Sequence, residues 1–219
     1  MKKLFALMVV ALLLVGCAPK PFWTLTDDAN RLVTSTSFEF SVADGWARTT
    51  QPRTFERLAI DGEQRTLLLE SMTVTRDGTG LHAMTITRRY PDTAFPTIKK
   101  KSAASMLPPE AADLYVSELR KRTGLERLAV LSNKPARVDG KQGFQLVMQF
   151  KNDDGLRIQI MTYGFVDKTG FYTISYRSPS LYYHDRDLRV FTNLVGSFKQ
   201  LKAAFEPPPE IPGWAKIFT

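Results

Sequence analysis

The pattern of hydrophobic and polar positions predicts β-structure between residues 38 and 89. Phe38, Phe40 and Val42 share one face at a period of two, and Ala43-Asp44-Gly45 then supplies a turn. Two later runs, rich in threonine and β-branched residues, flank Asp77-Gly78-Thr79-Gly80, which is typical of a hairpin. The strands expected in this part of the chain are 38–42, 55–60, 65–76 and 81–89.

The period changes to that of a helix after residue 107. Residues 90–107 contain two prolines and the lysine triplet and predict a loop, whereas Pro108 and Pro109 suit the first turn of a helix. One buried stripe at helical spacing is formed by Ala112, Tyr115, Val116 and Leu119. Gly124 is expected to end this helix, and the acidic residues at its start and the basic residues 120–122 at its end complement the helix dipole.

The second half of the chain predicts an antiparallel meander that a helix closes. Turn-forming segments at 139–140, 152–155 and 167–170 separate alternating runs. The strands expected are 125–131, 134–138, 143–151, a run containing Leu156, Ile158 and Ile160, and 171–177. A helix from about Asp185 to Phe198 is expected to bury Leu188, Phe191, Leu194, Val195 and Phe198. The fold class is therefore α+β, a mostly antiparallel sheet with helices packed on it.

The N-terminus carries a candidate modification site. Lys2 and Lys3 precede an apolar run that is too short to span a bilayer, and Leu14-Val15-Gly16-Cys17 closes it. This motif resembles the lipobox of bacterial lipoproteins, and the resemblance implies cleavage before Cys17 and a covalent lipid on its thiol. An ordinary signal peptide, or a buried helix with an incidental cysteine, is the alternative. Ala18 in place of an aspartate favours the outer membrane over the inner one under the sorting rule of that family.

These features predict four segments. Residues 1–16 are expected to be a signal peptide, 17–36 a lipidated N-terminus with a flexible tether, 37–200 one α+β domain, and 201–219 a proline-rich tail. A fully extended tether of ~18 residues would reach about 60 Å. The domain is expected to lie in the cell envelope, on the periplasmic face of the outer membrane.

Charge and cysteine content restrict the partners. Loss of Lys2 and Lys3 lowers the formal net charge from +8 to +6, and the single cysteine excludes disulfides within the chain. A basic protein in the envelope meets anionic lipid head groups, lipopolysaccharide and cell-wall polymers rather than nucleic acid. A modest positive charge that only maintains solubility is the alternative.

The order of elements resembles the PsbP-like α/β/α sandwich. The residues that carry the resemblance are the Phe-x-Phe-x-Val run before Asp44-Gly45-Trp46, the Val138-Asp139-Gly140 turn, the Asp167–Gly170 turn before Tyr172, and the closing Leu-Val-Gly-Ser-Phe of Leu194–Phe198. This fold is shared by the extrinsic photosystem II protein, DcrB-type bacterial lipoproteins and a Ran-binding nuclear import factor. The resemblance implies a noncatalytic module that binds other proteins, and it transfers no binding residue.

Few residues suit catalysis or metal binding. A lipidated Cys17 is unavailable as a nucleophile, which leaves His82 and His184 as the candidate bases. His82 is expected at a strand start, and His184 beside a helix that Asp185 caps. No nucleophile elbow, phosphate-binding glycine loop or zinc ligand pair occurs in the sequence, and Asn152–Gly155 is better explained as a turn than as a calcium loop. We therefore expect no catalytic residue, metal or cofactor apart from the lipid on Cys17.

Basic clusters are the remaining candidate site. Lys99, Lys100 and Lys101 lie in the proline-bounded loop, and Arg88 and Arg89 end a predicted strand. If such clusters converge, each cation contributes about 1 kcal/mol near an anionic membrane. The first hypothesis is a noncatalytic binding or assembly module with a protein partner in the envelope. The second is a direct binder of anionic lipid, lipopolysaccharide or cell-wall polymer, and an envelope enzyme is a distant third.

Overall fold

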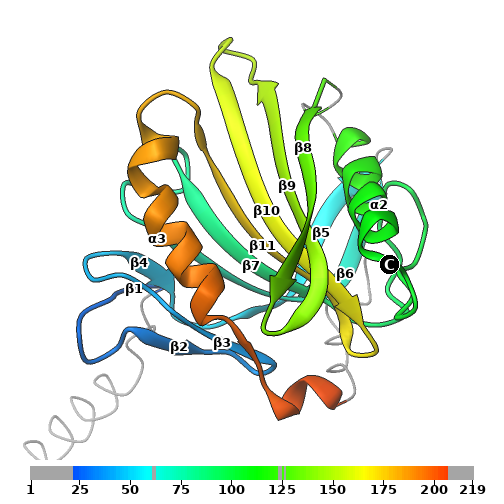
Figure 1. Cartoon of the computed structure of the whole chain (residues 1–219), viewed down its shortest axis with the longest axis horizontal. Helices are drawn as coiled ribbons and strands as arrows, with labels where there is room; N and C mark the ends of the chain where they lie inside the picture. Colours follow the sequence, from blue (N-terminus) through cyan, green and yellow to red (C-terminus); the bar gives the residue numbers. More distant parts are fainter. Residues whose placement is uncertain (1–21, 61–62, 123–124, 126, 207–219) are drawn as a thin grey trace, which may run out of the picture.

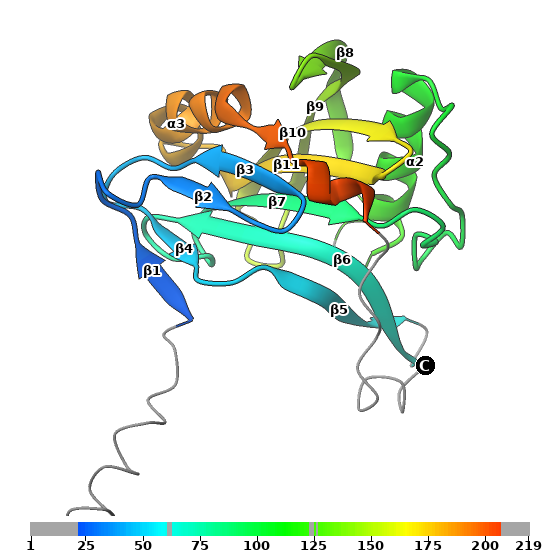
Figure 2. The ribbon, with the colours of Figure 1, turned by 90° about the horizontal axis from the view of Figure 1, so that it is seen from below.

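A curved antiparallel sheet with one helix on each face forms the framework of the molecule (Figures 1 and 2). The computed structural model describes residues 22–60, 63–122, 125 and 127–206. The elements in chain order are β1 (Trp23–Leu25), β2 (Leu32–Thr34), β3 (Phe38–Ser41), β4 (Ala47–Thr49), β5 (Arg53–Ile60), β6 (Glu63–Thr75), β7 (Ala83–Arg89), α2 (Pro108–Arg120), β8 (Ala129–Val138), β9 (Lys141–Lys151), β10 (Arg157–Asp167), β11 (Gly170–Pro179), α3 (Tyr183–Ser197), β12 (Lys199–Gln200) and the 3₁₀ helix η2 (Lys202–Phe205). The fold class expected from the sequence is confirmed.

The strand order explains how distant segments meet. Strands β8, β9, β10 and β11 form the predicted meander, and β11 then pairs with β7 and β7 with β6. Both β4 and β5 pair with β6, β4 near its C-terminal end and β5 along the rest, and β1 pairs with β4 at the outside. A second sheet, β12-β3-β2, brings residues 199–200 beside the N-terminal hairpin.

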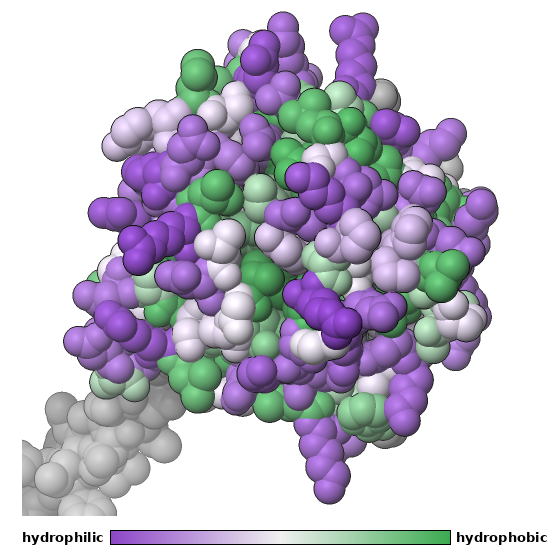
Figure 3. Space-filling view, in the orientation of Figure 1, coloured by the Kyte–Doolittle hydropathy of each residue, from purple (hydrophilic) through white to green (hydrophobic). Residues whose placement is uncertain are grey.

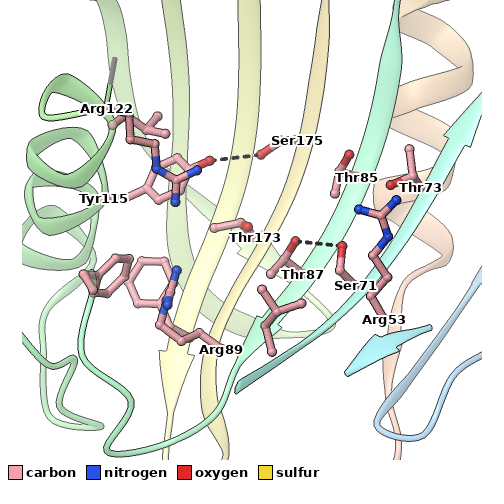
Figure 4. Close-up of a pocket in the computed structure, with 14 residues that line it drawn as sticks. Arg53, Ser71, Thr73, Thr85, Thr87, Arg89, Tyr115, Arg122, Thr173 and Ser175 are labelled. Carbon is pink, nitrogen blue, oxygen red and sulfur yellow. Dashed lines mark hydrogen bonds between the residues drawn. The ribbon is translucent and has the colours of Figure 1, made fainter. Parts of the chain in front are cut away.

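Two hydrophobic cores lie on opposite faces of the main sheet. One is covered by α3 and the small sheet and contains Phe38, Phe40, Phe191 and Phe198. The other lies under α2, which packs on β9, β10 and β8. Helix α2 covers only the part of this sheet face that β8, β9 and β10 form. The part of the same face that β6, β7 and β11 form therefore lies beside the helix and not beneath it (Figure 4).

Both predicted helices are confirmed, with shifted ends. Helix α2 ends at Arg120, and Gly124 lies outside the described residues. Helix α3 begins at Tyr183, so Asp185 lies in its first turn and the prediction that Asp185 caps the helix is wrong. The predicted buried stripes of both helices pack into the two cores, with Tyr115 and Leu188 partly buried.

The predicted flexible tether at residues 17–36 is wrong from residue 23 onward. Strand β1 pairs with β4, and β2 pairs with β3. Thr26 is 1% exposed, and its hydroxyl lies 2.8 Å from the Ala43 carbonyl and 2.6 Å from that of Trp46. A short polar run has no clear period, so hydrogen bonds to a distant strand, rather than local pattern, fix this segment. Cys17 and the lipobox lie outside the described residues.

Two further predictions need correction. The two strands expected at 125–131 and 134–138 are one strand, β8, with a register shift between Val130 and Ser132. Pro135 does not interrupt it because β8 is an edge strand, where a missing N–H donor is tolerated. The tail expected from residue 201 starts later, because η2 buries Ala204 and the Leu201 N–H donates to the Ser37 carbonyl at 2.8 Å. Residues 207–219 lie outside the described part of the chain.

Candidate functional site

The uncovered part of the sheet is a floor of hydroxyl groups. Strict alternation along β6, β7 and β11 directs Met72, Ile86 and Ile174 into the α3-side core and serine or threonine to the other face. Strand register aligns these hydroxyls in two rows across the three strands. The rows are Ser71–Thr87–Thr173 and Thr73–Thr85–Ser175. The floor is therefore a regular array of groups that donate and accept hydrogen bonds.

Some of these hydroxyls are already bonded within the protein. Ser175 lies 2.9 Å from the hydroxyl of Thr162 on β10 and 3.4 Å from that of Tyr115 on α2. Thr87 donates to Ser71 at 3.5 Å (Figure 4). The array consequently holds its geometry, and the half-buried hydroxyls retain capacity for a ligand.

Arginines form the two walls of this groove, which we call the hydroxyl groove. Figure 4 shows Arg122 and Arg89 on the α2 side and Arg53 on the β5 side, with the hydroxyls between them. Strand pairing places Arg53 opposite Ser71, at the end of one hydroxyl row. The groove has a volume of about 320 Å³, and Leu69, Phe95 and Phe171 contribute to its apolar lining.

The charged residues that line the groove are all positive among the described residues. Three arginines and no Asp or Glu are among the described residues that line it. Arg122 lies 3.4 Å from Glu118, a carboxylate that is itself fully buried and accepts hydrogen bonds from the Thr97 and Ile98 backbone N–H groups. Glu118 therefore offsets part of the positive charge that Arg122 brings to the groove. Arg89 stacks on Phe95, 4.5 Å from the ring centroid, which fixes its direction.

The hydroxyl groove continues along the sheet. A second hollow of about 540 Å³ shares Thr85, Ser175 and Arg122 with the first and extends past Arg177. Arg177 lies 5.8 Å from the ring centroid of Phe150, while Asp153 supplies one negative charge at that end. The combined site is an elongated groove with its cations at intervals rather than a single compact pocket.

The basic residues singled out from the sequence converge only in part: Arg89 and Arg122 line the groove, whereas Arg88 and the lysine triplet do not. Arg88 is 2% exposed on the opposite face of the sheet, so its role as a surface contact is wrong. It lies 3.7 Å from the buried Glu70 and donates to the carbonyls of Thr169 and Ala204, at 3.0 and 2.6 Å. Neighbouring residues of a strand face opposite ways, which is why Arg89 lines the groove and Arg88 does not.

The lysine triplet is exposed and does not line the groove. Lys101 lies 3.7 Å from Asp92, and both side chains are largely exposed. Lys99 adopts a positive φ of 55° in a turn where its N–H donates to Phe95 and the Lys100 carbonyl accepts from Phe95. This turn holds Phe95 in the lining of the hydroxyl groove, so the loop has a structural role.

Neither histidine is placed for reaction with a solvent-borne substrate. The His82 side chain is fully buried, 3.2 Å from Asp77 and edge-on to Trp46. Arg186 bonds both Asp77 and Asp187, and its guanidinium holds the pKa of Asp77 below its usual value. His184 is buried in the first turn of α3 and stacks on Tyr176, and burial lowers its pKa. Both histidines therefore hold α3 against the sheet.

Metal ligands do not cluster in the described part of the chain. Groups of three or more His, Cys, Asp or Glu side chains suited to a metal ion are absent there. No helix among the described residues is long and apolar enough to cross a membrane.

Arg53 and the six hydroxyls were missed in the sequence, and Arg122 was named there only as part of a basic cluster at the end of a helix. A usable signal was present, because Ser-Met-Thr-Val-Thr, Met-Thr-Ile-Thr-Arg and Tyr-Thr-Ile-Ser-Tyr all alternate hydroxyls with core residues. Such alternation predicts one polar face on each strand. The topology of the sheet decides which three strands are neighbours. The array of hydroxyls was therefore visible only in the structure.

The fold and the site together define the class of this protein, which is an α+β domain with a cationic, hydroxyl-lined groove beside α2. No protein-family model matches the sequence, and no curated protein matches it either.

Several solved structures are similar to this chain in shape. The solution structure of PsbP from Synechocystis sp. PCC 6803 aligns over 85% of this chain and 98% of its own, at 10% identity and a TM-score of 0.44. The immunity protein TplEi of Pseudomonas aeruginosa aligns over 90% and 83%, at 10% identity and a TM-score of 0.38. LpqN of Mycobacterium tuberculosis, involved in cell envelope biogenesis, aligns over 81% and 90%, at 10% identity and a TM-score of 0.35.

Proposed function

We propose that this protein is a noncatalytic binding module of the bacterial cell envelope, anchored by lipid on Cys17, that holds an anionic envelope component in the hydroxyl groove. The lipobox motif supports the anchor and the location on the periplasmic face of the outer membrane. A stable anchor needs two or more acyl chains, since one chain binds a membrane only reversibly.

One observation carries the binding site: Arg53, Arg89 and Arg122 converge from three different elements on a floor of hydroxyls. Arginine forms paired hydrogen bonds with phosphate and carboxylate groups, and serine or threonine hydroxyls suit the hydroxyls and oxygens of a sugar. The groove therefore fits a phosphorylated or carboxylated glycan better than it fits an apolar chain. Among the two hypotheses from the sequence, this geometry favours direct binding of an anionic lipid, lipopolysaccharide or cell-wall polymer.

The noncatalytic assignment rests on the same residues. Threonine and serine hydroxyls of the floor have no histidine or carboxylate base within the described lining of the 320 Å³ groove. The two histidines are buried elsewhere and are held in structural contacts. We propose no cofactor and no metal.

Ligand titration of the full-length lipidated chain, purified in a nonionic detergent, tests this function. The probes are lipopolysaccharide, anionic phospholipid and soluble peptidoglycan fragments, each in a separate titration. Replacing Arg53, an exposed side chain, with glutamine should raise the dissociation constant of the bound probe by about 10- to 100-fold, since a hydrogen bond to a charged group contributes roughly 1.5–3 kcal/mol. Rising salt should weaken binding of the native chain.

A matched control is Lys134→Gln, which removes one exposed cation on β8 at the far edge of the sheet. This variant should bind like the native chain. Equal loss in both variants would point to a diffuse charge effect, and no binding of any probe at low salt would refute the proposed ligand class.

A further inference from the structure

The described part of the domain begins at Phe22, five residues after Cys17. The Thr50 N–H donates to the Phe22 carbonyl at 3.0 Å, and β1 then pairs with β4 from Trp23 to Leu25. Five residues span at most about 17 Å when fully extended. The link to a lipid on Cys17 is therefore far shorter than the ~60 Å that a tether of ~18 residues would allow.

Exposed hydrophobic side chains gather at this edge of the molecule. Phe22 is 54% exposed, Trp23 36% and Leu25 65%. Over the face of the molecule seen in Figure 3, hydrophobic and hydrophilic residues are interspersed. Phe22 and Trp23 also contact each other edge to face, with ring centroids 5.4 Å apart.

We infer that the β1 edge docks against the head-group region of the same bilayer that carries the anchor. This inference rests on the lipid anchor of the proposed function and adds to it a membrane-contact surface, formed by Phe22, Trp23 and Leu25. Aromatic rings, tryptophan above all, are favoured at the boundary between head groups and acyl chains. The short link holds these side chains within reach of that boundary, and for this reason we take the bilayer as the partner of this surface.

Charges at this edge are compatible with docking. The Asp27 carboxylate accepts hydrogen bonds from the Ala29 and Asn30 N–H groups, and Asp28 pairs with Arg31 at 2.8 Å. Both acidic side chains thus have partners within their own turn. Arg53 lies over the Phe22 ring, 5.5 Å from its centroid, and adds a positive charge at this edge.

Arg53 also connects the two surfaces. It forms one wall of the hydroxyl groove while it stacks on a residue of the membrane-contact surface. Docking of the β1 edge therefore places the Arg53 side of the groove beside the membrane, where an anionic head group of the anchoring leaflet can enter.

Site-specific labelling of the full-length lipidated chain in phospholipid vesicles tests the docking. Acylation consumes the Cys17 thiol, so a single introduced cysteine can carry an environment-sensitive fluorophore. Leu25→Cys places the label on β1, and Leu131→Cys places it on β8, an equally exposed site at the opposite edge of the sheet. We expect the label at position 25, and not that at 131, to shift to the blue and to be quenched by brominated lipids.

Two outcomes separate the docking from the anchor. Mass spectrometry of the mature N-terminus measures acylation, and an unmodified Cys17 would overturn both proposals. With Cys17 acylated, an unquenched label at position 25 would overturn the docking alone. A third variant, with about 15 Gly and Ser residues inserted before Phe22, should keep most of the quenching, and replacing both Phe22 and Trp23 with serine in that long-linker chain should abolish it.

Discussion

At the scale of single residues, His184 shows how burial makes stability depend on pH. Its ring is 3% exposed and stacks on Tyr176, with ring centroids 5.3 Å apart, and Nε2 lies 2.9 Å from the Gln159 side chain. Burial disfavours the charged imidazolium and lowers the pKa of His184 from its usual 6.5. The unfolded chain therefore binds the proton at a higher pH than the folded chain does.

This difference predicts loss of stability in mild acid. Above pH 6.5 both states are neutral at this residue, and as the pH falls below 6.5 only the unfolded state takes up the proton, so the free energy of unfolding decreases. The decrease ends below the folded-state pKa. Urea unfolding at a series of pH values from 7.5 to 5 measures it. His184→Gln should flatten this part of the curve, and a curve of unchanged slope would contradict the assignment.

At the scale of elements, β1 depends on one buried hydroxyl. The Thr26 N–H donates to the Trp46 carbonyl at 2.8 Å, and its side chain reaches the carbonyls of Trp46 and Ala43. Thr26→Val keeps the shape and removes the hydroxyl, which should lower the free energy of unfolding by about 1–2 kcal/mol. Hydrogen exchange of the Thr26 amide should become faster, because β1 loses its fixed end.

Thr24→Val is the matched control on the same strand. The Thr24 hydroxyl bonds that of Thr50 at 2.8 Å and is half-buried, so water replaces this bond at small cost. Equal losses of stability in the two variants would show that β1 is held by its strand pairing alone.

The elements that the sequence predicted well are those with a long, clean period. Alternation located β9, β10 and β11 of the meander and the β6–β7 hairpin, and helical spacing located the stripes of α2 and α3. Strands β1 and β2 have three residues each, too few for any period, and their partners are distant in sequence. The hydroxyl groove depends on the order β6-β7-β11, which no local pattern encodes.

At the scale of the whole molecule, a buried ion pair joins three parts that are far apart in the chain. Glu70 on β6 is fully buried, accepts hydrogen bonds from the hydroxyls of Ser35 and Ser37 beside the small sheet, and pairs with Arg88 on β7. Arg88 in turn donates to Ala204 in η2. The pair thus links the N-terminal hairpin, the main sheet and the segment after α3.

Breaking this link from one side should destabilise the molecule strongly. Arg88→Met leaves the Glu70 carboxylate buried without its cation, and we expect the free energy of unfolding to fall by about 3–5 kcal/mol. Arg88→Met combined with Glu70→Gln should recover part of the loss, since no buried charge remains. Urea unfolding followed by circular dichroism measures both. Arg177→Met, an exposed arginine on β11, should change stability by less than about 0.5 kcal/mol, and an Arg88→Met variant as stable as this control would show that the three parts are held by packing alone.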